Sequence, residues 1–304
     1  MCGIVGYVGD RDCADVLVDA LSKLEYRGYD SAGIAVFEKG RIKVEKCKGR
    51  LANLVDKMAV DGKPQGHCGI GHTRWATHGE PSDINSHPHG NKRVSIVHNG
   101  IIENYKQIKD FLIEEGYSFV SETDTETVAK LLDYYYVDDP VDTIIKVLSE
   151  IKGSYALGIM FRDYPDTVFA VRKECPLIVG VGENENFLAS DVPAIIKYTR
   201  DYYLLEANEI AVVKKDSVQI YDMHKEPVHK EINTADWDVD AAEKGGYEHF
   251  MLKEIHEQPA AVRDTVSPRI INGMPDLSQD GVDMQKLKDY RQIFIVACGT
   301  AMHA

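Results

Sequence analysis

Apolar side chains recur at helical spacing in several parts of the chain. Between residues 13 and 25 they fall three or four positions apart, at Val16, Leu17, Ala20, Leu21 and Leu24. This spacing predicts a helix with one buried face, and Asp12 precedes it where a capping side chain is preferred. The same period predicts further helices over residues 50–60, 103–115, 124–136, 141–151 and 191–198.

Short apolar or alternating runs between these helices predict strands. They fall at residues 2–9, 31–38, 41–47, 69–74, 94–98, 154–161, 167–171, 177–181, 187–189, 209–214 and 218–222. The runs 31–38 and 41–47 are separated only by Lys39-Gly40, and the last two runs lie on either side of a turn around Lys215-Asp216, which is typical of antiparallel hairpins. Helices mixed with antiparallel hairpins indicate an α+β fold rather than a parallel doubly wound sheet.

The pattern predicts two domains. Residues 1–225 form the first, and the polar stretch 226–247, with Gly245-Gly246, is expected to be a linker. In residues 248–304 the pattern predicts a helix over 250–266 and a buried strand over 293–297 that leads into Cys298-Gly299-Thr300. A strand that enters such a loop normally continues into a helix whose N-terminus can hold a phosphate. We therefore expect the second segment to be the truncated start of a longer domain.

The charge balance narrows the classes of partner. The chain has 35 Lys and Arg against 49 Asp and Glu, a formal net charge of −14. Such an acidic protein is not expected to bind nucleic acid or an anionic membrane surface. No apolar run approaches the length of a membrane span, and the N-terminus lacks the pattern of a signal peptide. These observations predict a cytoplasmic protein.

The cysteine at position 2 is the first candidate for chemistry. The six cysteines are scattered without a C-x-x-C pair, so the sequence does not indicate a disulfide framework. If Met1 is removed, Cys2 carries a thiol and a free α-amino group, which combines a nucleophile with a base. The alternative is a buried strand whose cysteine acts as a small hydrophobic residue.

Three polar clusters stand at the ends of predicted elements. Arg74 offers a planar fork suited to a carboxylate, and Trp75 could cover a ligand, although a solvated loop explains both equally well. The amide of Asn99 and the N–H of Gly100 could donate to an oxyanion, while Asn-Gly is also the commonest tight turn. Asp124 could bind an ammonium group, but a helix cap is the simpler interpretation.

The histidines invite a metal hypothesis that the spacing does not support. Six of the eleven histidines lie between positions 67 and 98, without an H-E-x-x-H motif or a completing cysteine pair. Only His87 and His89 form a pair worth testing, and a solvated loop explains them as well. We therefore predict no metal and no cofactor.

Four motifs occur together in one order, at residues 1–6, 25–33, 71–79 and 98–100. In combination they resemble the N-terminal-nucleophile glutamine amidotransferases, and within that family the branch that transfers ammonia to fructose 6-phosphate. Residues 250–259 and 298–300 resemble the entry into the sugar-isomerase half of that branch. The resemblance implies a four-layer αββα sandwich of two antiparallel sheets, followed by a linker and a partial α/β isomerase segment.

The resemblance also implies a reaction. Cys2, after removal of Met1, attacks the side-chain carboxamide of L-glutamine, and its own α-amino group takes the thiol proton. Asn99 and Gly100 stabilise the tetrahedral oxyanion. Arg74 binds the substrate α-carboxylate and Asp124 binds its α-ammonium group. Water then releases glutamate from the γ-glutamyl thioester.

Five further residues receive supporting roles from the resemblance. Thr77 and His78 help to hold the α-carboxylate end, and Trp75 belongs to a loop that closes over the site. Arg27 and Gly28 orient the N-terminus.

The resemblance implies fructose 6-phosphate as the ammonia acceptor, giving glucosamine 6-phosphate, only when the isomerase half is present. It implies a homodimer for the longer protein. Two alternatives stay open. The chain could belong to a phosphoribosylamine-forming or asparagine-forming branch, or it could be a non-catalytic glutamine-binding module if Met1 is retained.

Overall fold

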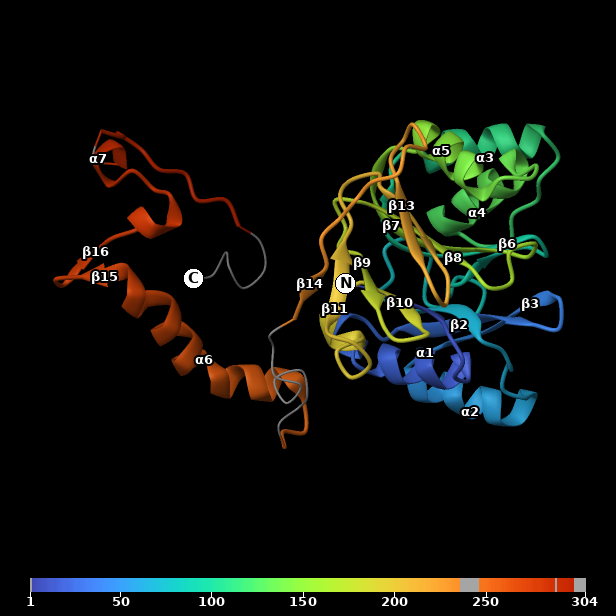
Figure 1. Ribbon diagram of the computed structural model, residues 1–304, viewed down its shortest axis with the longest axis horizontal. Helices are drawn as coiled ribbons and strands as arrows, with labels where there is room; N and C mark the ends of the chain where they lie inside the picture. The colour runs from blue at the N-terminus through green and yellow to red at the C-terminus, as the bar shows by residue number, and fades with distance from the viewer. Residues whose placement is uncertain (1, 236–245, 288, 298–304) are drawn as a thin grey trace. The chain divides into compact units, whose positions relative to one another are not determined.

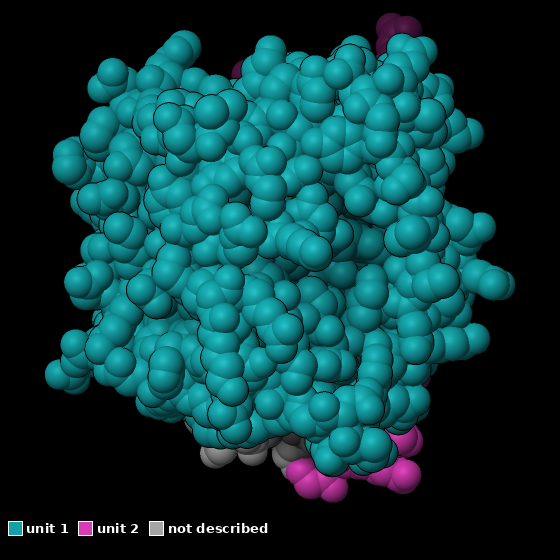
Figure 2. All heavy atoms as spheres, turned by 90° about the vertical axis from the view of Figure 1, so that its right-hand side faces the viewer, with its two compact units in different colours: residues 1–243 teal, residues 244–304 magenta. Residues whose placement is uncertain are grey.

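The computed structural model describes residues 2–235, 246–287 and 289–297. The chain divides into two compact units, residues 1–243 and 244–304 (Figure 2), and each is described by itself.

The first unit is built around two antiparallel sheets (Figure 1). The eight-stranded sheet has the order β14 (Asn233–Thr234), β11 (Asp201–Leu204), β9 (Ile178–Val181), β10 (Asn186–Ala189), β1 (Gly3–Val8), β4 (Cys68–Arg74), β2 (Ser31–Glu38) and β3 (Arg41–Lys48). The six-stranded sheet has the order β13 (Val218–Tyr221), β12 (Ile210–Val213), β8 (Val168–Lys173), β7 (Gly153–Phe161), β6 (Val94–Ile102) and β5 (His89–Gly90).

Helices cover the outer face of each sheet. Figure 1 shows α1 (Cys13–Ser22) and α2 (Leu51–Asp61) on the side of the first sheet. It shows α3 (Tyr105–Glu114), α4 (Asp124–Tyr135) and α5 (Pro140–Glu150) on the side of the second. Three buried clusters fill the spaces between helices and first sheet, between the two sheets, and between second sheet and helices. The predicted four-layer αββα sandwich is confirmed.

Strand β1 shows why the N-terminal run is apolar on both faces. Val5 and Tyr7 pack in the cluster beneath α1, whereas Ile4 and Val8 point into the layer between the sheets. Side chains alternate along a strand, so Cys2 shares the inward face with Ile4. A central strand in a layered fold is buried on both sides, and all six residues of β1 are buried.

The periodic patterns predicted most elements of this unit correctly, and the exceptions have physical causes. The helix expected over residues 191–198 is only a 3₁₀ turn, Val192–Ala194, which begins with Asp191 as cap and contains Pro193. Strands β5, β11 and β14 were not predicted. β5 and β14 have only two residues each, which is too short for an alternating pattern, and none of the four residues of β11 is buried, so no apolar face marks it.

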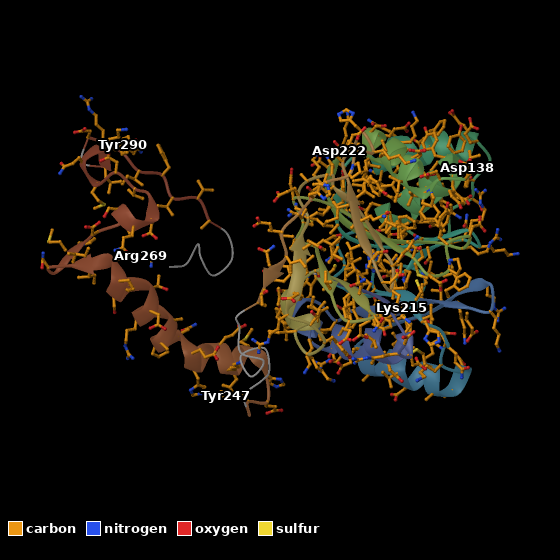
Figure 3. All side chains as sticks on the ribbon, in the orientation of Figure 1. Asp138, Lys215, Asp222, Tyr247, Arg269 and Tyr290 are labelled. Atoms are coloured by element: carbon orange, nitrogen blue, oxygen red, sulfur yellow. The ribbon has the colours of Figure 1, made fainter. Side chains whose placement is uncertain are left out.

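The second unit contains the predicted helix, α6 (Phe250–Val266). A short hairpin of β15 (Ile270–Ile271) and β16 (Met274–Pro275) follows, and then the single-turn helix α7 (Met284–Leu287). Arg269, labelled in Figure 3, lies just before the hairpin and forms a two-pronged ion pair with Asp280 at 2.6 and 2.8 Å.

The strand expected at residues 293–297 is wrong, because these residues are exposed and have no strand conformation. A strand needs a neighbour for its backbone N–H and C=O groups, and no described strand pairs with this segment. The expected loop Cys298-Gly299-Thr300 lies outside the described residues. In the expected linker, β14 pairs with β11. The domain boundaries stay predictions.

Within the described parts of the chain, no helix has the length and apolar character that crossing a membrane requires.

Candidate active site

A cavity of about 440 Å³ opens where the layer between the two sheets reaches the surface of the first unit. Its size falls in the range of small-molecule sites. Nine of the ten predicted site residues line it, namely Cys2, Arg27, Arg74, Trp75, Thr77, His78, Asn99, Gly100 and Asp124. Only Gly28 is absent from its wall. Residues far apart in the sequence therefore meet in one cavity, as the motifs predicted.

Strand pairing brings Cys2 to the end of β4. Gly3 pairs with Thr73, so the thiol of Cys2 lies beside the residues that follow Arg74. The backbone N–H of Trp75 donates to Cys2 Sγ at 3.2 Å, and the thiol lies 3.4 Å from the carbonyl oxygen of Trp75. Burial raises the pKa of the Cys2 thiol, and the hydrogen bond from Trp75 offsets this only in part. A thiol in this state needs a base before it can attack.

Gly28 lies behind this contact rather than in the cavity. A Cβ atom at this position would stand 3.0 Å from both the backbone nitrogen and the Cβ of Trp75. The absent side chain therefore lets the Trp75 backbone approach, and that backbone is the group that contacts the Cys2 thiol.

Arg27 anchors the start of β1 from the side. Its buried guanidinium donates to the carbonyl oxygen of Ser190 at 3.1 Å and to the carboxylate of Asp191 at 3.0 Å. Ser190 in turn exchanges hydrogen bonds with the backbone of Ile4, each 3.0 Å long. These bonds connect Arg27, through Ser190, to the strand that follows Cys2.

Asn99 and Gly100 are not at a strand end or in a turn, which corrects the expectation from the Asn-Gly pattern. Strand β6 continues to Ile102, and Asn99 and Gly100 pair with Ala156 and Tyr155 of β7. Gly100 has a φ of 122°, and a Cβ there would lie 2.1 Å from the Ser154 carbonyl oxygen. A turn residue was predicted because glycine permits this backbone, but the tertiary pairing uses it within a strand.

The Asn99 amide faces Cys2. Its Nδ2 atom donates to the Cys2 carbonyl oxygen at 3.1 Å, while its Oδ1 atom lies 3.0 Å from His72 Nε2. Asn99 is buried and lines the cavity next to Cys2. The side chain thus presents N–H groups on the side where a tetrahedral oxyanion would form.

Arg74 has an unused donor. Its Nη2 atom donates to the carbonyl oxygens of His78 and Gly79, the latter at 2.8 Å. Its Nη1 atom is buried and has no hydrogen-bond partner among the described residues. A buried guanidinium nitrogen without a partner is costly unless a ligand satisfies it. In a cavity wall this arrangement suits a carboxylate.

Asp124 supplies the opposite charge. The cap of α4 is Thr123, whose side chain accepts from the Glu126 N–H, and Asp124 is the first helical residue. The interpretation of Asp124 as the cap is therefore wrong by one position. Its Oδ2 atom accepts from the Ile102 N–H at 2.8 Å, and its carboxylate lines the cavity. Arg74 and Asp124 together complement a zwitterion.

Trp75, Thr77 and His78 lie on the segment that follows β4. The His78 ring contacts Thr77 Oγ1 at 3.4 Å and meets the Tyr105 ring edge to face at 5.4 Å. Trp75 is half exposed. Asp30 holds the segment by accepting a hydrogen bond from the Ala76 N–H. Asp30 belongs to a quoted motif but was not predicted as a site residue.

His72, His87 and His89 form a packed cluster of rings next to the cavity, and His87 itself lines the cavity wall. The rings of His72 and His87 stack with centroids 4.1 Å apart, and His87 meets His89 at 4.9 Å. The solvated loop proposed for His87 and His89 is wrong, because both are buried. Burial lowers the pKa of each of these histidines and of His98. In the described parts of the chain, no three His, Cys, Asp or Glu side chains are grouped to hold a metal ion.

Several cavity residues were missed, including Thr123, Thr125, Ser154, Cys175 and Pro176. They come from neighbouring strands and from the first turn of α4. No local pattern marks them, because their position depends on how the two sheets pack.

Comparison with known proteins agrees with this geometry. Residues 72–197 match the family described as glutamine amidotransferase domain. Over its whole length the chain is also 57% identical to glutamine–fructose-6-phosphate aminotransferase (isomerizing) of Caldanaerobacter subterraneus subsp. tengcongensis, of which it covers 50%. This chain carries a glutamine amidotransferase domain.

Other relatives of the amidotransferase domain bear the same name. The chain is 48% identical to glutamine–fructose-6-phosphate aminotransferase (isomerizing) of Aquifex aeolicus and again covers 50% of it. The chain thus spans about half the length of the curated relatives it matches.

Solved structures share the fold of the amidotransferase domain. The glutamine phosphoribosylpyrophosphate amidotransferase of B. subtilis has a TM-score of 0.64 at 24% identity, covering 73% of this chain and 49% of that one. A glutamine aminotransferase class-II domain protein from Silicibacter pomeroyi has a TM-score of 0.53 at 13% identity, covering 73% and 99%. These similarities confirm the predicted fold class.

Proposed function

We propose that this amidotransferase domain hydrolyses L-glutamine to glutamate and ammonia through a γ-glutamyl thioester on Cys2. One observation carries the proposal: a thiol, a pair of oxyanion donors and two opposite charges line the same cavity. Arg74 and Asp124 would bind the α-carboxylate and the α-ammonium group. The carboxamide would then lie one side-chain length away, next to the thiol, which converts the attack into a pre-oriented step.

The base in this mechanism is the α-amino group of Cys2 after Met1 has been removed. The raised pKa of the Cys2 thiol means that little thiolate exists before substrate binds. An α-amino group with a pKa near ~8 can take the proton at neutral pH and return it to the leaving ammonia. The S–C bond forms as the amide carbonyl becomes an oxyanion, and the C–N bond then breaks. Water attacks the thioester and releases glutamate.

The remaining predicted residues support these steps. Arg27 and Gly28 would hold the strand and the Trp75 backbone that position the thiol. Thr77 and His78 would help to bind the α-carboxylate end, and Trp75 would cover the bound substrate. These roles rest on the positions of the side chains around the cavity.

For the longer protein we propose transfer of this ammonia to fructose 6-phosphate, giving glucosamine 6-phosphate. The support is the name shared by relatives that match the whole of this chain. The phosphoribosylamine-forming alternative is less favoured, because its structures resemble only the fold at 24% identity. A homodimer and a cytoplasmic location remain parts of this proposal.

A glutaminase assay combined with intact mass measurement tests the proposed function. We expect the chain without Met1 to release glutamate, and a glutamine-mimicking electrophile to add once, at Cys2. Cys2→Ala should abolish both, while Cys175→Ala, which removes another thiol of the same cavity, should retain alkylation at Cys2. Glutamine hydrolysis by Cys2→Ala would refute the mechanism, and so would full activity of protein that retains Met1.

A further inference from the structure

His72 is a fully buried residue of β4 that does not line the cavity. It lies on the same face of its strand as Ile70, which packs in the layer between the sheets. Its ring crosses that layer and contacts β6, the strand that carries the predicted oxyanion donors. Cys2 directly precedes β1, which pairs with β4, so His72 connects the sheet that follows the proposed nucleophile to the strand of Asn99.

The surroundings of His72 define its tautomer. Its Nε2 atom lies 3.0 Å from the backbone carbonyl oxygen of His98 and 3.0 Å from Asn99 Oδ1. A carbonyl oxygen can only accept, so Nε2 must carry the proton and share it between the two oxygens. The ring is neutral, because burial lowers the pKa of His72 to about 3. Its Nδ1 atom is buried without a partner among the described residues.

The same reasoning determines the orientation of the Asn99 side-chain amide. The amide atom next to His72 Nε2 must be an acceptor, because His72 already donates to the His98 carbonyl. The other amide atom lies 3.1 Å from the Cys2 carbonyl oxygen and must therefore be the donor. Only one orientation of the amide satisfies both contacts, and it directs the N–H groups toward Cys2.

A second histidine keeps the His72 ring in place. The His87 ring stacks on it at 4.1 Å with an angle of 16° between the planes. His87 Nδ1 accepts from the His98 backbone N–H at 3.3 Å, so His98 is held at both its N–H and its carbonyl by this stack.

We infer that His72 is a positioning residue that holds the Asn99 amide with its N–H groups directed at the oxyanion site beside Cys2. The inference rests on the proposed glutaminase function. Without the His72 donor, the amide can rotate and present Oδ1 to the oxyanion, which repels it. The loss concerns charge that develops in the transition state, so it lowers kcat rather than substrate binding.

Two substitutions at position 72 provide a matched contrast. In His72→Gln the side-chain amide nitrogen reaches the place of Nε2, whereas in His72→Asn it reaches only the place of Nδ1. Both are neutral and polar. We expect His72→Gln to keep kcat for glutamine within about threefold of the unsubstituted protein. We expect His72→Asn to lose about 10- to 100-fold in kcat, with KM changed less than about threefold.

A buried control separates this effect from general damage to the stack. His89→Asn changes a histidine of the same stack whose Nε2 contacts Thr123 rather than Asn99. It should leave kcat within about threefold of the unsubstituted protein. In an Asn99→Ala background, His72→Asn should cause no further loss of kcat, because the residue through which it acts is gone. Equal losses in His72→Gln and His72→Asn, or additive losses with Asn99→Ala, would overturn the inference.

The tautomer can be read without any substitution, which keeps the inference testable if His72→Asn does not fold. In protein labelled with ¹⁵N-histidine, the His72 ring should show a protonated Nε2 and an unprotonated Nδ1 from pH 5 to 8. An Nδ1–H tautomer or a charged ring would overturn the inference even in an active enzyme. Absence of glutamine hydrolysis by unsubstituted protein lacking Met1 would instead refute the proposed function.

Discussion

Replacing Arg74 by lysine keeps a positive charge in the cavity but removes the planar guanidinium group with its two terminal nitrogens. In the structure, one guanidinium nitrogen is occupied by the carbonyl oxygens of His78 and Gly79, and Nη1 is left for the ligand. A lysine has a single ammonium group at the end of a flexible chain. It can satisfy the two carbonyls or reach the substrate, but it cannot do both. Arg74→Lys should therefore weaken the contact with the α-carboxylate.

The size of the effect follows from the bond that is lost. A hydrogen bond between charged groups contributes about 1.5–3 kcal/mol, and the upper value applies where the donor is buried. A loss of about 3 kcal/mol corresponds to about 100-fold in kcat/KM. Because the α-carboxylate does not change during the reaction, the interaction is equal in the ground and transition states. The loss should appear in KM, with kcat changed less than about threefold.

Steady-state hydrolysis of two substrates tests this reasoning. Glutamine α-amide carries a neutral carboxamide in place of the α-carboxylate, so Arg74→Lys should lower its kcat/KM by less than about tenfold. Arg93→Lys serves as the control, because Arg93 also donates to a backbone carbonyl, that of Tyr136, but lies outside the cavity wall. Equal losses for glutamine and its α-amide would show that Arg74 does not bind the carboxylate.

Three further predictions concern stability. In Gly100→Ala the new Cβ atom would lie 2.1 Å from the Ser154 carbonyl oxygen. The substitution should therefore unfold the domain or lower its Tm by more than about 8 °C in calorimetry. An unchanged Tm would contradict the close packing at Gly100. The pKa of His72 is about 3 in the folded state against about 6.5 unfolded, so the unfolded chain binds the extra proton between these values. This group should therefore lower the free energy of unfolding by about 1.4 kcal/mol for each pH unit below 6. When the free energy of unfolding is measured with urea at several pH values, His72→Gln should show a weaker dependence on pH than the unsubstituted protein. If the free energy of unfolding depends on pH equally in both proteins, His72 is not neutral in the folded state. Lys46 Nζ donates to the carbonyl oxygens of residues 84, 86 and 88 at 2.7 to 3.2 Å. Lys46→Met should therefore lower the free energy of unfolding, measured with urea, by about 2–4 kcal/mol. An unchanged free energy of unfolding would mean that water replaces the ammonium group.

The site could be predicted to the extent that its residues sit in motifs. Cys2, Arg74, Asn99 and Asp124 each carry a group that has an evident use in glutamine chemistry, so the resemblance assigned them before any geometry was known. His72 was within a quoted motif as well. It was considered only as a metal ligand, because nothing in the local sequence shows that its ring faces an amide 27 positions away.

The periodicity of the sequence by itself determined the two hairpins and every α-helix of the first unit, although it also predicted one helix, over residues 191–198, that is only a 3₁₀ turn; burying one face of an element leaves a repeating pattern in its own residues. It could not determine the continuation of β6 through Gly100 or the lack of a strand at residues 293–297. Both depend on whether a partner strand lies alongside: β7 pairs with residues 99–102 of β6, and no described strand pairs with residues 293–297. The contact between Asn99 and Cys2 joins residues 97 positions apart on different sheets. Only the packing of the two sheets decided that the proposed nucleophile and the proposed oxyanion donors meet, because that distance is set between layers rather than along the chain.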